Sequence, residues 1–228
     1  MAARIEGMGD EVPIEVAGRL ESGEAPDSVA RSMGLEALGL IAAIARLGLG
    51  GEGSEGPGLV HSAPARPKLA KALSETSLSG LLPGSSRPSR LALSAGLLQI
   101  LDHWEASHAA AQEGDDLGER VGSAYWHMIA HRREPDPGNA HYWARRVGRH
   151  AILGALAEES RPLLEAHGDP ALSARLIGDG AFRPPSMIDF ADRARPGSSL
   201  DALARRLQRV EMILLLDATV RVRQEPKE

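Results

Sequence analysis

The 228-residue sequence contains no cysteine. Disulfide bonds, thiolate metal sites and a cysteine nucleophile are therefore excluded. No apolar stretch reaches the roughly 20 residues that a membrane-spanning helix needs, and charged residues stand near the N-terminus where a signal peptide has its apolar region. The protein has no excess of positive charge: its 26 Lys and Arg and 31 Asp and Glu give a net charge of −5. We expect a cytoplasmic protein with no membrane and no nucleic acid among its partners.

One segment has the spacing of a DNA-binding motif but lacks the side chains that such a motif needs. Ala30, Gly34 and Leu40 have the offsets of a helix-turn-helix. The helix that would enter the groove is apolar and contains a single arginine, in the sequence EALGLIAAIAR. Because it offers no base-reading side chains and almost no phosphate anchors, an ordinary packed pair of helices is the better interpretation.

Strand-like alternation is also scarce, whereas Ala- and Leu-rich segments place apolar residues three and four positions apart. The sequence therefore predicts an all-α, single-domain helical bundle. We expect an N-terminal helical pair with a Gly-rich linker over residues 1–58, a bundle with a polar central pocket over 59–221, and a solvated tail over 222–228. The expected helices cover 13–22, 27–47, 67–80, 89–113, 118–133, 140–158, 160–167, 170–177 and 199–221, with a loop over 182–186.

Chemistry-bearing residues are concentrated in the middle of the chain. All three Trp, both Tyr and six of the eight His lie between residues 103 and 150. On the expected helix over 89–113, Glu105, His108 and Gln112 share a stripe with leucines, so these polar groups require partners. Their spacing, Glu-x-x-His, is one with which helical bundles present a carboxylate and an imidazole to a metal ion.

The following helix adds His127 and His131, one turn apart on the same face. Two imidazoles at this spacing can bind one ion, although packing beside Trp126 and a contact with the helix end would also account for them. We expect His108, His127 and His131 to converge and, with Glu105, to hold a divalent metal. A ligand set without thiolate suits Zn²⁺, Fe²⁺ or Mn²⁺.

Directly after His131 the sequence becomes rich in arginine. Arg146 shares a stripe with Trp143 and is expected to face inward, either paired with Glu134 or Asp136 or clamping an anionic ligand. Between the two helices, Pro137 and Gly138 can form a type II turn, after which Asn139 would cap the next helix.

These residues favour a metal-dependent enzyme of the hydrolase or oxygenase type that acts on a small anionic molecule. Glu134 or Asp136 is the expected general base. The expected substrate-binding residues are Arg132, Arg146, Asn139, Tyr142, Trp143 and Gln112. Two alternatives remain: a metal-free protein that binds an anionic ligand with the same arginines and aromatics, and a structural or scaffolding protein whose polar network fixes the register of its helices.

The central run resembles the motif H-R-R-E-P-D-x-x-N-A-x-Y-W-x-R-R-V-G-x-H of an all-α protein family to which no activity is attached. His131 to Asp136, Asn139, Tyr142 and His150 carry the resemblance, which extends over about 95–215 and includes Asp189 and Glu211. The resemblance implies that this motif is the functional centre, and it implies no particular reaction.

Overall fold

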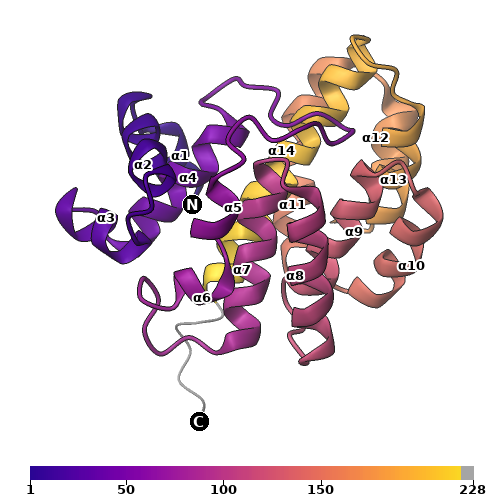
Figure 1. Cartoon of the computed structure of the whole chain (residues 1–228). Coiled ribbons are helices and arrows are strands. Elements are labelled where there is room, and N and C mark those ends of the chain that lie inside the picture. Colours follow the sequence, from indigo (N-terminus) through magenta and orange to yellow (C-terminus); the bar gives the residue numbers. More distant parts are fainter. Residues whose placement is uncertain (222–228) are drawn as a thin grey trace.

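The computed structural model describes residues 1–221, and the predicted tail over 222–228 lies outside this range. It confirms the all-α class: within the described part, helices are joined by loops and by one short hairpin (Figure 1). The helices are α1 (Ala2–Glu6), α2 (Glu11–Glu21), α3 (Pro26–Ser32), α4 (Ala37–Leu49), α5 (Leu69–Ala72), α6 (Glu75–Leu78), α7 (Arg87–Ile100), α8 (Trp104–Asp116), α9 (Ser123–Arg133), α10 (Pro137–Val147), α11 (Ile152–His167), α12 (Pro170–Leu176), α13 (Pro184–Arg193) and α14 (Ser199–Arg221).

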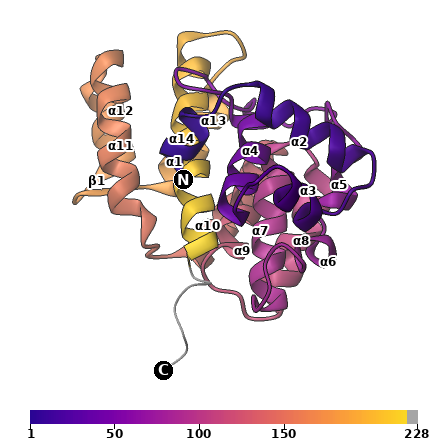
Figure 2. The same ribbon diagram turned by 90° about the vertical axis from the view of Figure 1, so that its left-hand side faces the viewer.

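Two hydrophobic clusters form the interior, and α14 contributes to both. The larger one joins α1–α4 to α7–α10 and to the second half of α14, from Met212 to Val220. The smaller one joins α11, α12 and α13 to the first half of α14 through Leu203 and Leu207. Figure 2 shows α11 and α12 side by side at one edge of the molecule, with α14 beside them. The helix predicted over 199–221 is thus the element that connects the two cores.

The long helix expected over 89–113 is two helices, α7 and α8. Asp102 adopts a left-handed conformation with φ of 63°, which an aspartate tolerates better than most residues and which ends a helix. Its carboxylate accepts hydrogen bonds from Arg133 Nη2 (2.5 Å) and Ser62 Oγ (2.8 Å). The break therefore holds Asp102 against the end of α9, and the expected single stripe from Leu97 to Gln112 is divided between two helices.

Other element boundaries differ from the predictions for local reasons. The helix expected over 27–47 is interrupted at Gly34 (φ 64°), and the one over 140–158 at Gly148 (φ 55°), because both glycines adopt positive φ. Residues 177–178 and 181–182 pair as an antiparallel hairpin, β1 and β2, that was not predicted. The loop expected over 182–186 instead contains the start of α13, whose first residue, Pro184, occupies the helix position where proline is tolerated.

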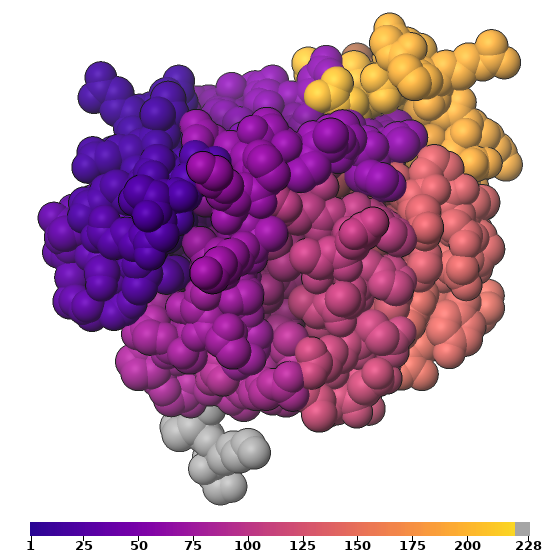
Figure 3. Space-filling model, viewed as in Figure 1, coloured from indigo at the N-terminus to yellow at the C-terminus, as the bar shows by residue number. Residues whose placement is uncertain are grey.

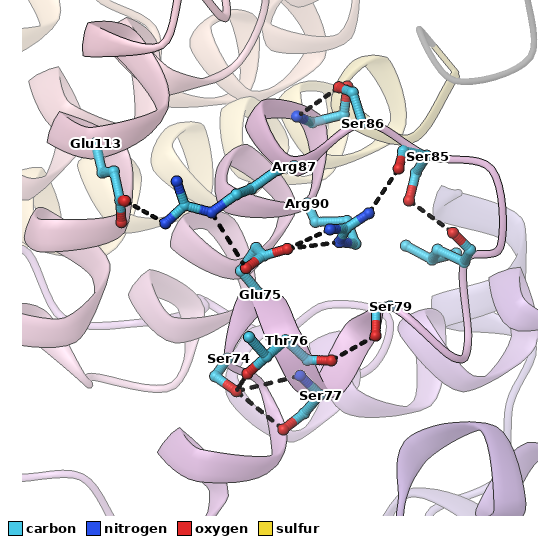
Figure 4. A network of polar contacts seen from close by, with 12 residues as sticks. Ser74, Glu75, Thr76, Ser77, Ser79, Ser85, Ser86, Arg87, Arg90 and Glu113 are labelled. Carbon is cyan, nitrogen blue, oxygen red and sulfur yellow. Dashed lines mark hydrogen bonds and ion pairs between the residues drawn. The ribbon is translucent and has the colours of Figure 1, made fainter.

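A polar network fixes α6 and α8 against α7 (Figure 4). Glu75 of α6 receives Arg90 Nε at 2.8 Å and lies 3.6 Å from Arg87 Nε, and Arg87 also pairs with Glu113 of α8. Ser86 caps the start of α7 by accepting from Ser89 N at 3.2 Å. These contacts hold the far end of α8 against α7, and α8 packs along its length on α9.

No single helix within residues 1–221 is long and apolar enough to cross a membrane, and only α3 and α4 taken together, as a pair bent by 107°, satisfy that length and composition. Most residues of α4 are buried in the larger cluster. Figure 3 shows the N-terminal helices forming one flank of the surface, opposite the segment that follows α9.

The close contact between Gly96 of α7 and Trp126 of α9 predicts that a larger residue at position 96 lowers the stability of the protein. A Cβ atom added at Gly96 would lie 2.7 Å from the ring of the fully buried Trp126. Gly96→Ala should therefore lower the free energy of unfolding by about 1–3 kcal/mol, because overpacking displaces the indole. Gly154→Ala, on an open face of α11, should instead be neutral or stabilising by up to about 1 kcal/mol. Urea unfolding measures both, and equal effects would contradict the packing argument.

Candidate metal centre

His108, His127 and His131 converge, as the sequence predicts. Their ligand atoms all lie within 4.8 Å of one another, and His127 and His131 are buried. His108 Nε2 and His127 Nε2 are 2.8 Å apart. This separation permits an N–H···N hydrogen bond, and it is close to the roughly 2.9 Å between two ligands at right angles on one ion with metal–nitrogen bonds of about 2.0–2.1 Å. The structure thus contains a buried group of three histidines that can hold a metal ion.

Contacts between α8 and α9 bring these rings together. Trp104, one turn before His108, donates its Nε1–H to the carbonyl of Ala130 on α9 at 2.9 Å. Farther along α8, a Cβ at Gly114 would lie 2.3 Å from Ser123 Oγ, so the absence of a side chain permits the approach of the two helices. The start of α9 is fixed by Glu119, whose carboxylate accepts from the backbone N–H groups of residues 121–123 at 2.5–2.9 Å.

Aromatic rings enclose the three histidines on two sides. Trp143 of α10 stacks on His127, with ring centroids 3.8 Å apart and an interplanar angle of 19°. Trp104 lies on the other side, 5.2 Å from the ring of His108. Tyr142, predicted to contact substrate, is 47% exposed next to Trp143. These indole contacts restrict the movement of the His127 and His108 rings.

The environment favours the neutral form of His127 and His108. Burial and, to a smaller extent, the neighbouring rings of His108 and His131 together lower the pKa of His127 from 6.5 to about 3. Burial likewise lowers the pKa of His108, with a contribution from His131. Neutral imidazole is the form that binds a metal ion, so at neutral pH little proton competition opposes binding.

Glu134 contacts the group from outside through His131. Its Oε2 lies 2.9 Å from His131 Nδ1, so the ring can donate Nδ1–H to the carboxylate and keep the lone pair of Nε2 free. The side chain of Glu134 is 37% exposed. A ligand atom of Asp136 also lies within 4.8 Å of those of His131 and Glu134. The structure therefore brings both predicted general bases to the edge of the histidine group.

Two residues predicted to belong to the site, Glu105 and Gln112, lie away from the three histidines. Glu105 is exposed and lines a separate surface cavity with His61 and Trp104. Gln112 donates to Asp116 at 2.8 Å on the exposed side of α8. Glu105, His108 and Gln112 are all on α8, and the break at Asp102 separates them from the leucines of α7 on which the prediction of an inward direction depended.

The predicted pairing of Arg146 with Glu134 or Asp136 is wrong. Arg146 contacts Asp115 of α8 through Nη2 at 2.5 Å, and its side chain is 41% exposed. Its guanidinium carbon also lies 5.2 Å from the centroid of the Trp143 ring. Arg146 is near the C-terminal end of α10 and Asp115 is near that of α8, and both helices pack on α9. Glu134 and Asp136 lie in the connection between α9 and α10, one end of α10 away from Arg146.

Arg132 is buried among polar partners contributed by α14. Its Nη2 lies 2.5 Å from Glu211 Oε2 and 3.2 Å from Gln208 Oε1. Tyr125 donates its hydroxyl hydrogen to the other oxygen of Glu211 at 2.9 Å. This network connects α9 to α14, and Gln208 was not among the residues that the sequence singled out.

The cap of α10 is Asp136 and not Asn139. Asp136 Oδ1 accepts from the backbone N–H of Asn139 at 3.0 Å, and its Oδ2 accepts from the Asn139 side chain at 2.6 Å. The expected type II turn is absent because Pro137 and Gly138 already belong to the first turn of the helix. The proline fits there because its missing N–H has no partner in that turn.

Comparison of the chain with protein-family models, with curated proteins and with solved structures gives no match.

The capping of α10 by Asp136 predicts how the free energy of unfolding depends on this residue and on pH. Asp136→Ala should lower the free energy of unfolding more than Asn139→Ala, because only the first removes the acceptor of the helix N–H. The hydrogen bonds from Asn139 hold the pKa of Asp136 below its usual 3.8. The contribution of Asp136 is therefore present above pH 3.8 and is lost as the pH falls through the lower folded-state pKa. Unfolding curves in neutral and acidic buffer test this, and equal losses at neutral pH would contradict it.

Proposed function

We propose that the protein is a metal-dependent hydrolase that acts on a small anionic molecule at the three-histidine group. One observation carries the proposal: three buried or half-buried imidazoles from α8 and α9 have their ligand atoms within 4.8 Å. Three protein ligands leave at least one position on the ion for water or substrate, which distinguishes catalytic from structural sites.

The donor set favours hydrolysis over oxygen chemistry. The set typical of non-haem Fe²⁺ oxygenases is two histidines and one carboxylate, whereas the third donor here is His131 and the predicted carboxylate, Glu105, is exposed. Imidazole ligands suit Zn²⁺. When bound, such an ion lowers the pKa of a coordinated water to about 7 and thereby supplies a nucleophile at neutral pH.

The roles of the surrounding residues follow from their contacts. Glu134 orients His131 by accepting its Nδ1–H, as carboxylates commonly do for metal-binding histidines. Asp136, at the exposed edge of the group, is the candidate general base. Because three neutral imidazoles leave the charge of a divalent cation uncompensated, an anionic substrate is favoured. Arg132 and Arg146 already have carboxylate partners, so we assign the recognition of that charge to the cation.

A structural protein is the second candidate, and the network around Arg132 is the observation that favours it. Arg132 and Glu211 are each only 1% exposed and join α9 to α14. Such a network can fix the register of two helices without any reaction. The two candidates differ in whether stoichiometric metal is present.

Metal analysis decides between them. Protein purified without an affinity tag should contain close to one equivalent of divalent metal, and His131→Ala should lose it. With metal removed from both proteins, the thermal transition of the variant should move only modestly, since bound metal itself stabilises the folded state. His167→Ala, at the end of α11 and outside the histidine group, is the matched control and should keep the metal. Wild type without metal, with His131→Ala simply less stable, would support the structural candidate.

A second measurement tests the role assigned to Glu134. Glu134→Gln should weaken metal binding by about 10–100-fold, because loss of an orienting carboxylate lowers the basicity and order of the coordinating ring. Competition with a chromophoric chelator measures the dissociation constant. Glu113→Gln, on α8 beside Arg87, provides the control with the same chemical change. Unchanged affinity in Glu134→Gln would show that the contact with His131 is not part of the centre.

A further inference from the structure

A cavity of about 310 Å³ lies where the C-terminal ends of α8 and α10 meet the start of α9, and none of the three histidines lines it. Helices α8 and α10 both pack on α9 (Figure 1). The charged residues of the lining are Asp115 of α8, Arg120 of the loop before α9, and Arg146 of α10. The volume lies at the lower end of the range of small-molecule sites. We call this space the Asp115 cavity.

One buried carboxylate in this cavity contacts two guanidinium groups. The side chain of Asp115 is 6% exposed, and its Oδ1 lies 3.2 Å from Arg120 Nη1 while its Oδ2 lies 2.5 Å from Arg146 Nη2. Two positive charges therefore share a single negative charge. Although Arg146 has a carboxylate partner, that partner leaves one positive charge of the pair of arginines without compensation.

The other titratable groups at the Asp115 cavity do not cancel this charge. Burial raises the pKa of Tyr125 and lowers the pKa of His150, so both are neutral at pH 7. His150 donates from Nε2 to the carbonyl of Val121 at 2.6 Å and accepts from the backbone N–H of Ile152 at 3.3 Å. The nearby carboxylate of Glu119 accepts from backbone N–H groups at the start of α9, where it compensates the positive end of the helix dipole.

The two guanidinium groups are held in place and still have donors available. A guanidinium has five N–H groups. Arg120 uses Nη1 for the carboxylate of Asp115 and for the carbonyls of Asp115 and Glu119, at 3.0–3.4 Å. Arg146 is oriented by Asp115 and by the ring of Trp143, whose centroid lies 5.2 Å from the guanidinium carbon. Since the side chains of Arg120 and Arg146 are 66% and 41% exposed, their remaining N–H groups can donate to a ligand.

The charge and the remaining lining determine the class of ligand. Arginine forks bind carboxylates and phosphates in the same way. One uncompensated positive charge matches a carboxylate better than a phosphate group, which carries about 1.5–2 negative charges at pH 7. The rest of the lining includes Val121, Ala124 and Val147, which offer an apolar surface to a short hydrocarbon chain.

We propose that the Asp115 cavity binds a small monocarboxylate with a short hydrocarbon chain, whose carboxylate group is held by Arg120 and Arg146. The site differs from the three-histidine group in its residues and requires no metal ion. Its test and the metal analysis therefore succeed or fail independently.

Three probes with the same propyl chain test the proposal. Titration of butyrate into the folded protein, followed by the NMR signals of the backbone amides, should show saturable binding with the largest changes at residues 120–125 and 146–150. Butyramide has the same size but no charge and should bind at least about 10-fold more weakly, because it forms no charge-assisted hydrogen bond. Propylphosphonate, with its greater negative charge, should also bind more weakly than butyrate.

Arg120→Gln tests the residue that belongs to this cavity alone. It should weaken butyrate binding at least about 10-fold. Because the side chain of Arg120 is exposed and Asp115 keeps Arg146 as its partner, the variant should remain folded, which its thermal transition checks. Arg120→Lys keeps the charge but loses the planar fork, and it should lose part of the affinity. Arg161→Gln, on the exposed side of α11, is the control with the same chemical change and should bind butyrate like wild type.

Three outcomes would each overturn the proposal. The first is that butyrate shows no saturable binding. The second is that butyramide or propylphosphonate binds as tightly as butyrate. The third is that Arg120→Gln and wild type bind butyrate equally well, as they would if the carboxylate bound at the three-histidine group.

Discussion

The ion pair between Arg132 and Glu211 is the contact on which the arrangement of α9 and α14 depends. Both side chains are 1% exposed, and their charged atoms are 2.5 Å apart. Burying each ion costs several kcal/mol, which is offset only when the remaining lone pairs and protons find partners. Tyr125 and Gln208 supply some of those partners. Because α14 runs through both hydrophobic clusters, this contact fixes α9 relative to the whole interior.

Helix α9 has no solvent-facing stripe, so its polar side chains contact the neighbouring helices and not water. All of its residues except Ala124 are buried. His127 and His131 meet α8, Arg132 meets α14, and Arg133 reaches the carbonyls of Gly58 and Gln99 as well as Asp102. A helix that is polar on several faces is stable in the interior only when most of its polar groups have partners, and α7, α8 and α14 supply them to α9.

The sequence predicts the parts of this structure that depend on local patterns. The helical class, the extent of α14 and the convergence of His108, His127 and His131 follow from spacings of three, four and seven residues. The break at Asp102 is different: a left-handed aspartate is stabilised by Arg133, a residue distant in the sequence. The partner of Arg146 could not be predicted either, because Asp115 becomes its neighbour only when α8 and α10 both pack on α9. The choice of Asp136 over Asn139 as cap depends on where Pro137 begins the helix, and both residues are good caps by type.

Two successive residues at the end of α9 direct their side chains into different environments. His131 and Arg132 are separated by about 100° around the helix axis, which places the imidazole with α8 and the guanidinium with α14. In the histidine group, burial keeps the pKa of His127 low, so this imidazole adds no charge at neutral pH. On the side of α14, Glu211 neutralises the guanidinium of Arg132. The two environments therefore differ in charge: the histidine group can accommodate a cation and the anion that the cation attracts, whereas the buried pair of Arg132 and Glu211 is already neutral.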